Sequence, residues 1–580
     1  MAKSVRVERD VPMAARDGVT LRSDLYRPDD DGRYPAILIR TPYNKLQAQY
    51  NDMWRAVDFA FRDYVVVIQD TRGRFASDGE FGTDRGEGPD GYDAVEWVAS
   101  QPWCNGRVGM AGGSYVGSTQ WQAAVLSPPS LSAIAPAIIG SNPSGSRFPG
   151  GALTLDRTVS WFPFMAVDML AKLESQGRAT PEMRQSVYRA VFNIEELYNF
   201  LPLREMKSRL PGLPGNMFNV LEHPSPDDPL WQNQPGEWTW ETVKVPGLHI
   251  GGWYDLFTEG TINNWESMRA KGGSARAKEG QHLLMGPWAH GTLLPSIVGG
   301  MHFGPSASGA PGQIVEHHLH FFDRYLKDMD IALPVVRYFV MGANRWRSAE
   351  TWPLPETEWQ RFYLRSKGRA NTAAGDGWLS REEPSSEPPD VFTYDPRFPV
   401  PTVGGRNLGA GRLVLGPFDQ TRIEQRHDVL VYSTPPLEQD LEVTGPLKLH
   451  LFAATSARDT DFVAKLTDVL PDGQSINVAE GIIRARFWKS GQQADLVNPG
   501  EIREYVIDLA AASNVFKKGH RIRLDVTSSN FPAFDRNMNT GQPIGTDKAG
   551  IPAVQTVLHE TGHASYIDLP VIPAKINIQR

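Results

Sequence analysis

The 580-residue chain has little cysteine, no long apolar run and no excess of positive charge. Its one cysteine, Cys104, excludes a disulfide within the chain. No stretch approaches the roughly 18 apolar residues of a membrane-spanning helix, and the N-terminus lacks the apolar centre of a signal peptide. With 59 Lys and Arg against 67 Asp and Glu, the net charge is −8. The sequence therefore predicts a cytoplasmic protein without a membrane or nucleic-acid partner.

The first quarter of the chain alternates strand-like and helix-like patterns. A length of 580 residues predicts two to four domains. The apolar runs 36–39 and 65–68 are typical of strands that are covered on both faces of a parallel sheet. Further elements are expected at 5–12 and 19–26 (a hairpin), 90–100 (helix), 107–111 (strand), 115–126 (helix) and 133–138 (strand). This alternation predicts a doubly wound α/β sheet.

The later sequence divides the chain into further domains. Helices are expected at 153–173 and 181–200, followed by a Pro- and Trp-rich stretch from 211 to 240. Sheet strands return at 248–252, 282–285 and 335–341, with a helix at 315–326. Beyond 352, short alternating runs between Gly, Pro and Asp turns predict a β-sandwich, a jelly roll. The expected divisions are 1–144 and 241–352 for the two parts of the α/β domain, 145–240 for an inserted helical cap, and 353–580 for the β domain.

One turn, Gly112-Gly113-Ser114-Tyr115-Val116-Gly117, joins an expected strand to an expected helix. A serine on such a corner is a nucleophile elbow, because the tight turn requires small neighbours and pushes the hydroxyl into the open. The second glycine comes at 117, one position later than in the usual G-x-S-x-G pattern. Gly-Gly-Ser is also an ordinary turn, so the elbow requires support from elsewhere in the chain.

That support comes from an acid and a histidine in the expected order. Asp255 follows the strand at 248–252, and His290 follows the strand at 282–285. In this class of enzyme the chain order is Ser, acid, His, with the last two residues on loops after strands. Each residue also has a simpler interpretation, since Asp255 can cap a helix and His290 can be an ordinary loop histidine. The three together predict a catalytic triad of Ser114, Asp255 and His290.

Two histidine clusters suggest a metal instead. His559-Glu560-Thr-Gly-His563 spells the H-E-x-x-H zinc-protease signature, which works only on a helix. Its flanks are strand-like, so Thr561-Gly562 is expected to be a hairpin tip and zinc is only a remote alternative. The histidines of 316–320 point to different faces of an expected helix. We therefore expect no metal and no cofactor.

Six stretches together resemble the X-prolyl dipeptidyl-peptidase-like (CocE/NonD) α/β-hydrolases, the family that includes bacterial cocaine esterase. They are TPYNK (41–45), VIQDTRGRFASDGEF (67–81), WCNGRVGMAGGSYVG (103–117), GGWYDLF (251–257), GPWAH (286–290) and SSNFPAFDRN (528–537). The resemblance implies an α/β-hydrolase fold with a helical cap and a C-terminal jelly roll. It implies Ser114 as nucleophile, His290 as base and Asp255 as its partner. It also implies an oxyanion hole from the Tyr43 hydroxyl and the Tyr115 backbone N–H.

The resemblance leaves the substrate open, because members cleave esters, amides and prolyl peptides. X-prolyl peptidases carry an additional N-terminal domain, and this chain is expected to start directly at the sheet, which favours an esterase acting on a small-molecule ester. A homodimer stays open. Trp161 and Phe257 are the candidates for the acyl pocket. In α-amino acid ester hydrolases of the family, carboxylates hold the substrate ammonium; the matching positions here are Lys45, Phe257 and Thr258. We therefore expect neutral aryl or alkyl acyl esters to be favoured.

Overall fold

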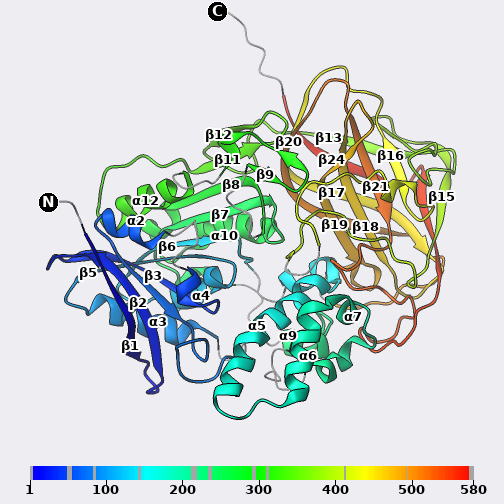
Figure 1. Ribbon diagram of the computed structural model, residues 1–580. Coiled ribbons are helices and arrows are strands. Elements are labelled where there is room, and N and C mark those ends of the chain that lie inside the picture. Colours follow the sequence, from blue (N-terminus) through cyan, green and yellow to red (C-terminus); the bar gives the residue numbers. More distant parts are fainter. Residues whose placement is uncertain are drawn as a thin grey trace, which may run out of the picture.

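The computed structural model describes residues 4–48, 55–82, 86–141, 145–210, 218–232, 238–290, 296–308, 313–409, 413–491 and 493–573. Figure 1 shows a sheet flanked by helices on the left, a group of helices below, and a β-rich domain on the right. In these ranges no helix combines the length and the apolar character that a membrane crossing needs.

The α/β part is built on one large sheet. Among the described residues it has ten strands in the order β1-β2-β4-β3-β5-β6-β7-β8-β11-β12. The strands from β4 to β11 along this order run parallel, and antiparallel strands close both edges. The bounds are β1 Val5–Ala14, β2 Thr20–Pro28, β3 Tyr34–Thr41, β4 Val65–Asp70, β5 Cys104–Gly113, β6 Leu131–Ala137, β7 Gly247–Tyr254, β8 Gln281–Ala289, β11 Val336–Val340 and β12 Arg345–Ala349.

Both faces of this sheet are covered, as the apolar runs predict. Along β3, Ile37 and Ile39 point into one core while Ala36 and Leu38 point into the other. The first core holds residues of α2 and α12, and the second holds residues of α3 and α4. The helices of this part are α1 Lys45–Ala48, α2 Ala56–Phe61, α3 Gly88–Ala99, α4 Tyr115–Ala124, α10 Thr258–Lys271, α11 Ala275–Glu279 and α12 Gln313–Leu326. Short strands β9 Ile297–Val298 and β10 Met301–His302 pair beside it.

Helices occupy the chain between β6 and β7, where the cap is expected. They are α5 Leu155–Ser175, α6 Pro181–Phe192, α7 Ile194–Tyr198, α8 Asn219–Glu222 and α9 Pro229–Gln232. Thr180 caps α6 by accepting a hydrogen bond from the Met183 N–H, with Pro181 in the first turn. The expected single helix 181–200 is wrong, because Asn193 leaves helical geometry and divides α6 from α7. The predicted broken stretch lies partly outside the described residues, at 211–217 and 233–237.

The C-terminal part is β-rich, with its described strands in one connected hydrogen-bonded network. The strands are β13 Glu358–Arg365, β14 Trp378–Ser380, β15 Ser386–Tyr394, β16 Leu430–Ser433, β17 Leu441–Thr455, β18 Asp461–Val469, β19 Ser475–Arg484, β20 Arg503–Phe516, β21 Arg521–Thr527, β22 Ala553–Glu560, β23 His563–Ala564 and β24 Tyr566–Ile572. This part contacts both others: Asp156 N–H of α5 donates to the Pro532 carbonyl, and Tyr254 donates to the Asn477 carbonyl. The boundary expected at 352/353 falls between β12 and β13.

Candidate active site

Ser114 occupies a strained corner between β5 and α4. Its backbone angles are φ 58° and ψ −125°, a region that side-chain-bearing residues rarely adopt. The glycines around it have a steric reason. A Cβ on Gly112 would come within 2.0 Å of Val116 Cγ1, and one on Gly117 within 2.9 Å of Ile139 Cγ2. Gly117 therefore lets α4 pack closely against the chain that follows β6, which explains a glycine one position late.

The structure brings together the three residues expected as a triad. His290 Nε2 lies 3.0 Å from Ser114 Oγ, and His290 Nδ1 lies 2.8 Å from Asp255 Oδ2. Asp255 and His290 directly follow β7 and β8, which are adjacent parallel strands. Asp255 is fully buried, and its other oxygen accepts the Phe257 N–H at 2.7 Å. The carboxylate is thus fixed on both sides, and it holds the imidazole toward the serine.

Tyr43 lies beside Ser114 with its hydroxyl aimed at the elbow. It is partly buried on the loop after β3, and its hydroxyl interacts with the Ser114 side chain. Trp161 of α5 donates its indole N–H to the Tyr43 oxygen at 3.3 Å. Burial raises the pKa of Tyr43, although Trp161 and Ser114 oppose that shift. The phenol therefore keeps its proton, and accepting from Trp161 leaves that proton available to a substrate oxygen.

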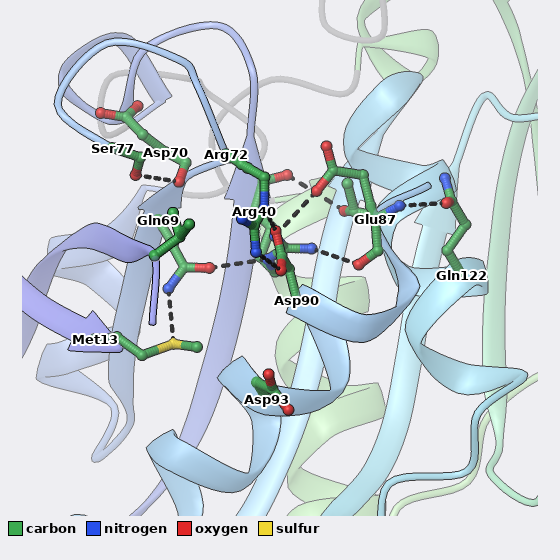
Figure 2. A network of polar contacts seen from close by, with 12 residues as sticks. Met13, Arg40, Gln69, Asp70, Arg72, Ser77, Glu87, Asp90, Asp93 and Gln122 are labelled. Carbon is green, nitrogen blue, oxygen red and sulfur yellow. Dashed lines mark hydrogen bonds and ion pairs between the residues drawn. The ribbon is translucent and has the colours of Figure 1, made fainter. Parts of the chain in front are cut away.

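Tyr115 offers its backbone rather than its phenol. As the first residue of α4, it has an N–H without an acceptor inside the helix. Its phenol points away and donates to Glu87 Oε1 at 2.9 Å. Glu87 is itself ion-paired with buried Arg40 at 3.0 Å. Figure 2 shows Arg40 between Gln69, Glu87 and Asp90, in a network that anchors this side of the elbow.

Phe257 and Arg157 form the wall next to the base. Phe257 is only 5% exposed, and its ring packs edge-on against the His290 ring with 5.6 Å between centroids. The Arg157 guanidinium, from α5, lies over the Phe257 ring, 4.9 Å from the ring centroid. Trp161 stacks on Tyr115 at 6.1 Å. Of the two candidate pocket residues, Trp161 thus contacts both tyrosines, whereas Phe257 packs against His290.

The two histidine clusters and Lys45 make other contacts. His559 is the next-to-last residue of β22 and His563 begins β23, so the H-E-x-x-H segment forms the predicted hairpin and not a helix. His559 is buried and bonded to Asp390 at 2.8 Å. On α12, His318 is buried while His320 is exposed, as different helix faces require. Lys45 directs its ammonium to Asp10 at 2.8 Å and Asp24 at 3.1 Å.

Two arginines were missed by the sequence reasoning. Arg74 is buried and donates to the Pro42 carbonyl at 2.9 Å and to the Met165 carbonyl at 3.0 Å. It thereby ties the loop of Tyr43 to the cap helix α5. The available sequence signal for Arg74 was its position within 67–81, one of the stretches that resemble the family. Arg157 lies outside the six stretches that resemble the family, so only the three-dimensional structure shows that it lies at the site.

Known proteins resemble the chain over nearly its whole length. Residues 17–292 match the X-Pro dipeptidyl-peptidase (S15 family), and residues 331–568 match the X-Pro dipeptidyl-peptidase C-terminal non-catalytic domain. Cocaine esterase of Rhodococcus sp. (strain MB1 Bresler) is 39% identical, with 98% of each chain covered.

Two solved structures share the fold from end to end. An aminopeptidase from a marine sediment archaeon, Thaumarchaeota archaeon, superimposes with a TM-score of 0.80 at 25% identity, covering 98% of this chain and 96% of the other. An α-amino acid ester hydrolase superimposes with a TM-score of 0.77 at 24% identity and the same coverage. The chain therefore belongs to the X-Pro dipeptidyl-peptidase (S15) family of α/β-fold serine hydrolases, and it is related to cocaine esterase along its length.

Proposed function

We propose that the protein hydrolyses carboxylic esters through an acyl-enzyme on Ser114. The observation that carries the proposal is the hydrogen-bonded relay from Asp255 through His290 to Ser114, at 2.8 and 3.0 Å. The 39% identity to a cocaine esterase supports ester over peptide substrates. An amide or peptide hydrolase, including an X-prolyl dipeptidyl-peptidase, is the alternative from the same family.

In the proposed reaction, Ser114 Oγ attacks the ester carbonyl carbon while its proton passes to His290 Nε2. The carbonyl oxygen becomes negative between the Tyr43 hydroxyl and the Tyr115 N–H, which both donate to it. His290 then gives its proton to the departing alcohol oxygen, leaving the acyl group on Ser114. Water attacks this ester, again losing a proton to His290, and the acid leaves as Ser114 Oγ regains that proton.

The acyl preference follows from the groups at three positions. A substrate ammonium requires a carboxylate, because an unpaired buried charge costs several kcal/mol. Position 45 is a lysine paired with Asp10 and Asp24, position 257 is a phenylalanine, and Thr258 donates its hydroxyl to the Gly252 and Asp255 carbonyls. We therefore propose that neutral aryl or alkyl acyl groups, against Trp161 and Phe257, are preferred over α-amino acyl groups.

The two parts of this proposal have separate tests. A fluorophosphonate should label Ser114 in the wild type and fail to label Ser114→Ala, which distinguishes a hydrolase from a binding protein. The kcat/KM for a phenylacetyl ester should clearly exceed that for the matching phenylglycyl ester. A ratio at or below one contradicts the acyl preference. Comparing kcat/KM for methyl phenylacetate with that for phenylacetamide then distinguishes an esterase from an amidase.

The cellular setting is proposed on composition alone. The presence of a single cysteine favours the cytoplasm, and a net charge of −8 argues against nucleic acid as a partner. A homodimer is retained as an open proposal. Cell fractionation and light scattering on the purified full chain test these two statements.

A further inference from the structure

Helix α5 presents two side chains to the site, one turn apart. Arg157 and Trp161 are separated by four positions and therefore share a helix face. Trp161 reaches the Tyr43 hydroxyl, while the Arg157 guanidinium covers the ring of Phe257 at 4.9 Å. Because Phe257 packs against His290, a positive charge lies one ring away from the catalytic base. The charge also acts on Tyr43, whose pKa it lowers against the effect of burial.

This guanidinium is held in place without a carboxylate of its own. Its Nη1 donates to the Ser146 carbonyl at 2.6 Å and to the Ser146 hydroxyl at 3.1 Å. Within the described ranges, no Asp or Glu forms an ion pair with Arg157. The acid that acts on it electrostatically is Asp255, both of whose oxygens are already bonded to His290 and Phe257.

The surroundings disfavour this charge, although the Arg157 side chain is partly exposed. Burial and the neighbouring guanidinium of Arg147 lower the pKa of Arg157. A guanidinium starts from so high a pKa that it still remains cationic at neutral pH. An anion stabilises a cation that is partly removed from water, and the planar fork of arginine suits a carboxylate. With Nη1 fixed by Ser146, the orientation of the remaining N–H donors is set in advance.

We propose that Arg157 binds a carboxylate on the acyl part of the ester, so that the preferred substrates are acid monoesters whose acyl group carries a second carboxylate. This inference rests on the proposed esterase function and narrows its substrate class. Phe257 and Trp161 take the apolar body of the acyl group, and Arg157 meets the anionic end. The same charge repels an ammonium, in agreement with the expected discrimination against α-amino acyl esters.

The test compares methyl phenylacetates that carry a 4-carboxylate, a 4-carboxamide or a 4-aminomethyl group, together with their 3-substituted isomers. The carboxylate and carboxamide esters are nearly isosteric, so the ratio of their kcat/KM values reports the effect of the negative charge alone. In the wild type we expect the carboxylate to exceed the carboxamide by about 10-fold or more, as for one charge-assisted hydrogen bond. Arg157→Gln should reduce this ratio to about one, because the carboxylate ester loses far more kcat/KM than the carboxamide ester does. Arg157→Lys should keep part of the ratio.

The matched control is Arg184→Gln, which removes the same charge from an exposed cap arginine paired with Glu174. It should leave the ratio unchanged. The inference is overturned if Arg157→Gln keeps the wild-type ratio, if it reduces all three esters equally, or if no substituted ester is cleaved while methyl phenylacetate is. A dependence on Arg157 for 4-carboxyphenyl acetate instead would place the carboxylate on the alcohol and equally overturn it. Failure to cleave methyl phenylacetate itself, without fluorophosphonate labelling, contradicts the proposed function rather than this inference.

Discussion

The two tyrosines of the proposed oxyanion hole should respond very differently to the same substitution. Tyr43→Phe removes a hydroxyl aimed at the elbow, whereas Tyr115→Phe removes one that points away, to Glu87. The backbone N–H of residue 115 survives either change. Loss of one oxyanion donor costs about 10²–10³-fold in kcat, or about 2.7–4 kcal/mol. We expect this loss for Tyr43→Phe, with little change in KM, because the donor acts on charge that develops in the transition state.

The free energy of unfolding should respond in the opposite order, with Tyr115→Phe more destabilising than Tyr43→Phe. In Tyr43→Phe, the Trp161 N–H loses an acceptor at 3.3 Å, in a partly buried place, which costs about 0.5–1.5 kcal/mol. In Tyr115→Phe, the buried Glu87 carboxylate loses a donor at 2.9 Å, which costs about 1–3 kcal/mol or more for a charged group. We expect Tyr115→Phe to retain kcat within about 10-fold.

The assay pairs kcat and KM on one aryl ester with urea unfolding of each variant. The reasoning about the hole is refuted if Tyr43→Phe stays within a few-fold of the wild-type kcat. It is also refuted if the two variants lose kcat equally, since the Tyr115 phenol would then be acting on the substrate or the elbow.

Three further predictions use other parts of the molecule. Ser114→Ala should lower turnover by on the order of 10⁴-fold or more without unfolding the elbow, and a variant that retains a tenth of the activity would exclude this nucleophile. Prolonged EDTA treatment should leave activity unchanged, because His559 and His563 lie on strands; loss that zinc restores would revive the metal interpretation. Burial lowers the pKa of His249 from 6.5 to about 4, so the unfolded chain takes up its proton first. Urea midpoints should therefore fall as the pH drops from about 6.5 to 4, and less steeply in His249→Gln.

The sequence predicted the sheet because its physical signals are local. The runs 36–39 and 65–68 contain apolar residues on both faces, and the structure buries them in two separate cores. The order of Ser114, Asp255 and His290 at strand ends was also readable, since parallel strands bring their carboxyl ends to one edge. The break between the helices at Asn193 was not readable from the sequence, because helical periodicity continues across it and only the backbone of Asn193 departs from helical geometry.

The site's electrostatics were much less accessible to sequence reasoning. Tyr43 was chosen through the family resemblance, and Trp161 and Phe257 were chosen as aromatics near the right elements. The contacts of Trp161 with Tyr43 and Tyr115 depend on how the cap meets the sheet, whereas the contact of Phe257 with His290 joins the segments that follow two neighbouring strands. Phe257 illustrates the difficulty: it was expected as an apolar group at the acyl site, and only the structure shows that its ring contacts both His290 and Arg157.

Arg157 and Trp161, which are proposed to select the acyl group, lie on a different part of the chain from the residues that carry out the reaction. The elbow, the relay and the Tyr115 N–H all come from the α/β sheet and α4, where Gly112 and Gly117 tolerate almost no change. The cap helix α5 contributes side chains above them without contributing to the strained turn. A residue on this face can therefore change from cationic to neutral and alter which acyl groups bind, while the Ser114 geometry stays fixed. Substitutions at 157 should then change substrate preference more than the rate on neutral esters, whereas substitutions at 117 should lower all rates together.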